Sequence, residues 1–149
     1  MNPFDPRTVL FAKHAQHVAL IHFPIALFVV GVIFDFLAQN AKRANLAVTA
    51  YYNFLGAAIS ALPVIVTGIL AWRLQLEGAK LKGPLLMHLI LGWLSGILIC
   101  VVWYWHFRSS KRFEPSRTRA RLALEALTVA VIMLTGHLGG FVSGVNGPN

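Results

Sequence analysis

Four long apolar tracts dominate the pattern of hydrophobic and polar positions along the chain. They run over residues 18–38, 46–72, 85–107 and 122–142. Each tract reaches the length of about 20 apolar residues that a helix needs to span the hydrocarbon core of a bilayer. A helix on the surface of a soluble domain would carry a polar face, and these tracts carry almost none. The pattern therefore predicts four transmembrane helices in a single domain, residues 1–149.

The polar linkers between the tracts are short, and short connections favour antiparallel neighbours. We therefore expect an all-α integral membrane fold, a bundle of four transmembrane helices with up-down-up-down topology. Residues 1–17 precede the first tract, and Asp5-Pro6 there is typical of a helix start. This predicts a helix on the outer surface of the membrane. The first tract is too long for a cleaved signal peptide, and no small-residue cleavage pattern follows it.

Composition agrees with a membrane protein, because 57% of the residues are hydrophobic and 12% are charged. The net charge of +8 is better explained by cytoplasmic loops near anionic lipid than by nucleic-acid binding. Eight of the 13 basic residues lie in the first and third linkers. The positive-inside rule then places both termini on the outer, periplasmic side of a bacterial inner membrane. Cys100 is the single cysteine, which excludes an internal disulfide and the motif for covalent haem attachment.

Ionisable residues within or beside the tracts are the candidates for function, because such residues are costly inside a membrane. The alternating topology sorts them into two layers. The outer layer contains the histidines His17, His22, His88 and His137. The inner layer contains Asp35, His106 and Glu125, with Asn53 as a candidate neighbour.

The outer histidines predict a metal or cofactor site, because neutral imidazole is a strong ligand for haem iron and other transition metals. A haem b held between two helices needs one histidine from each helix. We expect at least two of His22, His88 and His137 to ligate one haem iron. His17 lies five residues before His22, roughly 140° away on an ideal helix, so it would serve a second haem. Structural hydrogen bonding, a small metal site, a proton path and a quinone contact are the alternatives.

The inner residues predict pairing rather than metal binding. Asp35, His106 and Glu125 lie near the cytoplasmic boundary, where Arg43 or Arg121 could pair with them. They could also extend to the lipid headgroups. No combination of nucleophile, base and oxyanion donors is visible in the sequence, which argues against a hydrolase.

Several motifs together resemble the bacterial domain-of-unknown-function family 2231. They are the string from His17 to Leu27 (HVALIHFPIAL) with the following Asp35, Thr67-Gly68, His88, and the string from Thr135 to Gly140 (TGHLGG). The resemblance implies a four-helix membrane protein, and similar proteins are fused to Rieske or c-type cytochrome modules. Such fusions imply a redox role as a membrane carrier of haem b.

The sequence therefore predicts a b-type cytochrome-like electron-transfer protein, or a subunit of a redox complex, rather than an enzyme. Its expected partners are the lipid bilayer and other membrane or periplasmic redox proteins, such as a Rieske protein or a c-type cytochrome, with quinone as a further candidate. Two alternatives remain open. One is a cofactor-free structural or assembly subunit of a membrane complex, and the other is a quinol-binding subunit, in which a histidine and a carboxylate accept protons.

Overall fold

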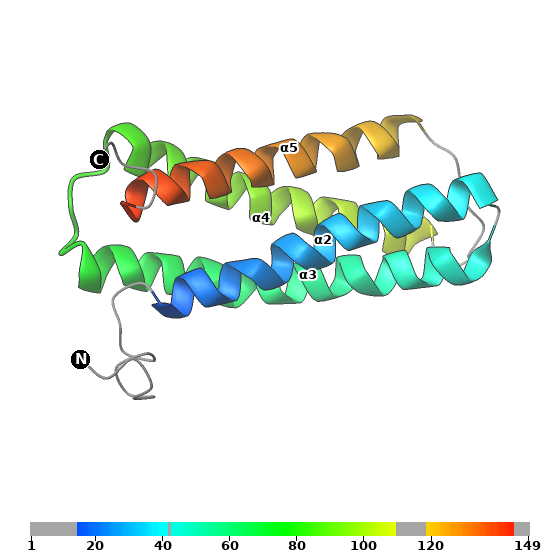
Figure 1. Cartoon of the computed structure of the whole chain (residues 1–149), viewed down its shortest axis with the longest axis horizontal. Coiled ribbons are helices and arrows are strands. Elements are labelled where there is room, and N and C mark those ends of the chain that lie inside the picture. The colour runs from blue at the N-terminus through cyan, green and yellow to red at the C-terminus, as the bar shows by residue number, and fades with distance from the viewer. Residues whose placement is uncertain (1–14, 42, 110–118, 145–149) are drawn as a thin grey trace.

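The computed structural model describes residues 15–41, 43–109 and 119–144. Four long helices follow one another in antiparallel order along one bundle (Figure 1). They are α2 Ala15–Ala41, α3 Ala44–Leu70, α4 Gly83–Ser109 and α5 Arg119–Val142. A short π-helix, η1 Ala71–Gln75, continues α3. The predicted all-α bundle of four helices with up-down-up-down topology is confirmed.

Each helix begins before the apolar tract that predicted it, and α2 and α4 also end after their tracts. For example, α2 covers residues 15–41, whereas the tract covers 18–38. Hydropathy marks only the residues that suit apolar surroundings, whereas the backbone hydrogen bonds of a helix continue into its polar flanking turns. All four helices are long and apolar enough to cross a membrane. The surface helix expected over residues 1–17 falls almost entirely on residues 1–14, outside the described residues.

The outer surface of the bundle is apolar, and its interior contains many small side chains. Large hydrophobic side chains such as Phe36, Leu62, Ile97 and Met133 are exposed, as expected for a surface that meets lipid. The buried residues of α3 are Ala50, Phe54, Ala57, Ala58 and Ala61. Small residues at these positions let membrane helices approach closely, where dispersion contacts stabilise the bundle.

The bundle consists of two hairpins. Helix α2 packs along α3, α4 packs along α5, and α3 also packs against α4, whereas α2 and α5 contact each other least among these pairs. The core between the hairpins is apolar and contains Phe28, Phe54, Ile99, Val102 and Ile132. The rings of Phe28 and Phe54 pack at a centroid distance of 5.2 Å. This core occupies the middle of the bundle and separates its two ends.

Gly31 is required where α2 lies against α3. A methyl group added at Gly31 would lie 2.9 Å from Cε1 of Phe54 and 3.3 Å from Cβ of Asn53. Overpacking of this kind typically costs about 1–3 kcal/mol. We therefore expect Gly31→Ala to lower the midpoint of thermal unfolding of the detergent-solubilised protein.

Gly92→Ala is the matched control, because a methyl group added there meets no atom of the described residues within 4 Å. It should leave the unfolding midpoint unchanged or raise it slightly, since alanine favours a helix more than glycine does. An equal effect of the two substitutions would show that Gly31 does not set the α2–α3 distance.

Candidate functional site

Polar side chains gather at both ends of the bundle. At the carboxylate end, α2 and α4 end and α3 and α5 begin. Its characteristic side chains are Asp35, His106 and Glu125. At the opposite end, the histidine end, α2 and α4 begin and α3 and α5 end. Its characteristic side chains are His17, His22, His88 and His137.

A buried ion pair between Asp35 of α2 and Arg121 of α5 connects the hairpins at the carboxylate end. Nη2 of Arg121 donates to both oxygens of Asp35, at 3.1 and 2.9 Å. The side-chain amide of Gln39, one turn further along α2, also donates to Oδ2 of Asp35. Buried charges need both a counter-charge and hydrogen bonds. These donors favour the carboxylate form of Asp35.

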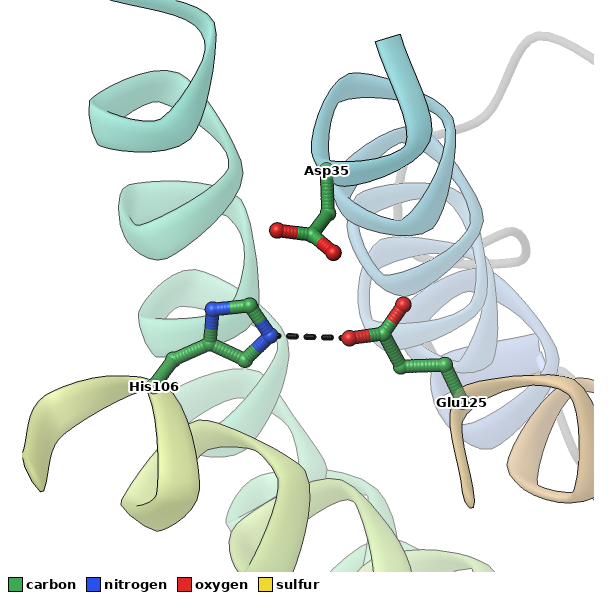
Figure 2. A group of neighbouring side chains, drawn as sticks. All are labelled: Asp35, His106 and Glu125. Atoms are coloured by element: carbon green, nitrogen blue, oxygen red, sulfur yellow. Dashed lines mark hydrogen bonds and ion pairs between the residues drawn. The ribbon is translucent and has the colours of Figure 1, made fainter. Parts of the chain in front are cut away.

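His106 and Glu125 form a second buried pair beside the first (Figure 2). Nε2 of His106 lies 2.9 Å from Oε1 of Glu125, and Nε of Arg121 lies 3.6 Å from the same oxygen. The second oxygen of Glu125, Oε2, is buried and has no hydrogen-bond partner among the described residues. Phe54 of α3 covers the imidazole of His106, with a centroid distance of 4.5 Å. The carboxyl group of Glu125 therefore has fewer hydrogen-bond donors than that of Asp35.

The arrangement follows from helical spacing. Arg121 and Glu125 are four residues apart on α5, and Asp35 and Gln39 are four residues apart on α2, so each pair shares a helix face. Of the two arginines considered from the sequence, the structure pairs Arg121 with Asp35. Gln39 was not among the residues predicted from the sequence, although its spacing of four residues from Asp35 is a usable signal.

Two residues considered for this end contribute little to the cluster. The amide of Asn53 donates to the carbonyl of Thr49 in its own helix at 2.9 Å. Arg43, the other arginine considered as a partner, is exposed. The structure therefore brings together Asp35, His106 and Glu125, while the hydrogen bond from the Asn53 amide to Thr49 stays within α3.

The three residues of the carboxylate end offer ligand atoms that all lie within 4.8 Å of one another. Carboxylate oxygens and imidazole nitrogens are common metal ligands. However, the guanidinium of Arg121 contacts both oxygens of Asp35, and its positive charge would repel a metal cation. The geometry thus suits hydrogen bonds and ion pairs among these side chains better than the coordination of a metal ion.

A cavity of about 380 Å³ lies at the histidine end, between the two hairpins. Its volume falls within the range of about 300–1,000 Å³ that is usual for small-molecule sites. Apolar side chains from all four helices form most of its wall. Its titratable side chains are His17, His22 and His88. The glycines in its wall on α4 and α5 are Gly92, Gly96, Gly136, Gly139 and Gly140.

His17 is oriented by α3. Its Nδ1 lies 3.2 Å from the hydroxyl oxygen of Thr67. That hydroxyl donates its own hydrogen to the carbonyl of Pro63, at 2.9 Å, so its oxygen accepts from Nδ1–H. A methyl group added at Gly68 would lie 3.0 Å from Cε1 of His17. The imidazole therefore packs closely against α3 at Gly68, where any larger residue would crowd the ring.

His88 is oriented by α5 in a similar way. Its Nδ1 lies 3.0 Å from the backbone carbonyl oxygen of Thr135, which can only accept, so Nδ1 carries the hydrogen. The ring packs against Gly139, where an added methyl group would lie 3.0 Å from Cε1. The side chain of Thr135 is itself held by Ser95 of α4, at 3.0 Å between the hydroxyl oxygens.

The remaining two histidines of this end differ from each other. Nδ1 of His22 donates to the carbonyl of Val18, one turn earlier in α2, at 2.7 Å, and its exposed ring lines the cavity. His137 is exposed and packs edge-on against Phe141, at a centroid distance of 5.0 Å. Among the described residues, the cavity wall includes His17, His22 and His88 but not His137.

The family model "Predicted membrane protein (DUF2231)" matches residues 13–147. The chain belongs to this family. The resemblance noted in the sequence is thus confirmed, and the family's description as membrane proteins agrees with the four apolar helices. No curated protein and no solved structure matches the chain. Because the family description names no reaction, the function has to be inferred from the geometry of the two ends.

Arg121→Ala would leave the buried carboxylate of Asp35 without its counter-charge. Removing one partner of a buried ion pair typically costs about 3–5 kcal/mol. We therefore expect a large fall in the thermal unfolding midpoint, measured by circular dichroism. The double variant Asp35→Asn/Arg121→Ala should recover part of the loss, because it buries no unpaired charge.

Arg119→Ala is the matched control, because Arg119 lies two residues earlier on α5 and is exposed. It should leave the midpoint unchanged. If Arg119→Ala and Arg121→Ala destabilised the protein equally, the ion pair with Asp35 could not be what holds α5 to α2.

Proposed function

We propose that the protein is a b-type cytochrome-like electron-transfer protein of the bacterial inner membrane, and that the cavity at the histidine end binds one haem b. One observation carries the proposal. His17 and His88 line the same cavity from different hairpins, and each directs its Nδ1–H to an oxygen of the neighbouring helix.

The hydrogen bonds of these rings suit metal ligation. A histidine that ligates a metal almost always donates its other N–H to an oxygen, which fixes the tautomer and the ring orientation. Donation from Nδ1 places the lone pair of the imidazole on Nε2. His17 and His88 meet this condition through Thr67 and Thr135, and His22 meets it through Val18.

The wall of the cavity also suits a flat, apolar ligand. Methyl groups added at Gly92 and Gly136 would meet no atom of the described residues within 4 Å, so these two glycines leave space on the cavity side of α4 and α5. Apolar side chains make up most of the remaining wall. A haem bound there would supply one-electron redox chemistry, and the surrounding bundle would exclude water from it.

In this proposal His17 and His88 would hold the haem iron, and His22 is a third histidine at the same cavity. Ligation by two imidazoles leaves no open coordination position on the iron, which favours electron transfer over oxygen chemistry. His137 is exposed and outside the cavity wall, so it is not assigned as a ligand.

The proposed partners are redox proteins that deliver and accept the electron. The fusion of similar proteins to Rieske or c-type cytochrome modules supports a periplasmic partner of that kind, and quinone in the bilayer is a second source of electrons. A partner on the periplasmic side requires the histidine end to face the periplasm. This orientation agrees with the excess of basic residues in the first and third linkers.

Haem binding is tested by optical spectra of protein that is expressed with ample haem and purified in detergent. The unmodified protein should show a Soret band and the low-spin spectrum of bis-histidine haem. His17→Ala and His88→Ala should each lose the low-spin spectrum, because each removes one of the two nitrogens that would hold the iron. His137→Ala is the matched control and should keep it. Folded, unmodified protein without a Soret band would contradict the proposal and favour a cofactor-free subunit.

Orientation is tested by reporter fusions at Asn149 and at Pro115. Because eight of the 13 basic residues lie in the first and third linkers, we expect a cytoplasmic reporter to be active at Pro115 and a periplasmic reporter to be active at Asn149. Cytoplasmic activity at Asn149 would reverse the orientation and place the histidine end in contact with the cytoplasm.

A further inference from the structure

The buried cluster at the carboxylate end contains unequal numbers of opposite charges. Asp35 and Glu125 contribute two carboxylates, Arg121 contributes one guanidinium, and His106 contributes an imidazole that is ordinarily neutral. These groups come from α2, α4 and α5, and Glu125, Arg121 and His106 are the ionisable groups that act on Asp35. The neighbouring helix, α3, presents the apolar ring of Phe54. The fully ionised carboxylates would leave one net negative charge inside the bundle.

The hydrogen bonds show which of the two carboxylates lacks donors for its negative charge. Both oxygens of Asp35 accept from Arg121, and one of them also accepts from Gln39. Glu125 is 0% exposed, yet its Oε2 has no partner among the described residues. A buried anionic oxygen without a donor is strongly disfavoured, whereas the carbonyl oxygen of a neutral carboxyl group needs less compensation.

We propose that the carboxylate end is a proton-binding site, in which Glu125 carries one exchangeable proton as a carboxylic acid. The acid hydroxyl is at Oε1 and donates to Nε2 of neutral His106, which lies 2.9 Å away. Oε2, the atom without a donor, is then the carbonyl oxygen. With this proton bound, the cluster consists of the ion pair between Asp35 and Arg121 and two neutral groups, and its net charge is zero.

The proton exchanges from one side of the bundle. Asp35 lies six residues before the end of α2 and His106 three residues before the end of α4, about 9 and 4.5 Å along the axis at 1.5 Å per residue. In the opposite direction, the buried side chains of Phe28, Phe54 and Val102 lie between the cluster and the cavity. The site therefore takes up and releases its proton at the carboxylate end, independently of what the cavity binds.

A proton fits the site better than a divalent cation does. Three ligand atoms converge, but a cation would have to approach Asp35 against the guanidinium that already contacts both of its oxygens. The charge also argues for a proton, since a single positive charge neutralises the cluster and a divalent ion would leave it positive.

The test is infrared difference spectroscopy of the purified full-length protein in detergent, between neutral and strongly alkaline pH. A protonated carboxyl group gives a C=O stretching band that disappears when it ionises, and ordinary exposed carboxylates are already ionised at neutral pH. The unmodified protein should show one such band. Glu125→Gln should abolish it. Glu77→Gln should retain it and is the matched control, because Glu77 is exposed between η1 and α4.

Asp35→Asn separates proton binding from a merely structural role of Glu125. This variant keeps Glu125 but removes one negative charge, so Arg121 then balances an ionised Glu125. The carboxyl band should disappear although the carboxyl group is still present, and circular dichroism should show an intact helical fold. A titration of the unmodified protein with Zn²⁺ should show no binding that depends on Glu125.

Three results would overturn the proposal. The first is the absence of a carboxyl band in the folded, unmodified protein. The second is persistence of the band in folded Glu125→Gln or Asp35→Asn protein. The third is stoichiometric Zn²⁺ binding that Glu125→Gln abolishes, which would make the cluster a metal site instead.

Discussion

The ion pair between Asp35 and Arg121 determines how the two hairpins meet. It joins α2 to α5, the pair of neighbouring helices with the least contact otherwise. Two charges buried among apolar helices cannot separate without leaving both unpaired, so the hairpins are held together at the carboxylate end. No comparable polar link between α2 and α5 is present at the histidine end among the described residues. It is there that the hairpins leave the cavity between them.

The two ends offer different chemistry because their polar groups are satisfied differently. At the histidine end, His17 and His88 direct Nδ1–H to oxygens of the neighbouring helix, which orients both rings at the cavity. At the carboxylate end, charges pair with one another and one oxygen of Glu125 stays without a donor. Among the described residues, an apolar core lies between the two ends and separates them.

The fold could be predicted from the sequence because a bilayer imposes a simple rule of length and hydrophobicity, which all four helices obey. The depth of each polar residue followed from its position in its tract. The direction in which a side chain faces did not follow, because it depends on how the helices pack. His17 and His22 line one cavity despite their spacing, and His137 lies outside its wall. Likewise the sequence offered Arg43 and Arg121 as partners, and only packing places Arg121 against Asp35.

The contacts of His17 in one hairpin correspond to those of His88 in the other. In each hairpin, a histidine near the start of the first helix rests against a glycine of the second helix and donates to a threonine oxygen there. Asp35 follows His17 by eighteen residues, and His106 follows His88 by the same interval. The hairpins thus share this spacing and these contacts, as parallel internal repeats do in other membrane proteins. Each hairpin thereby presents one histidine, in a similar setting, to the cavity between them.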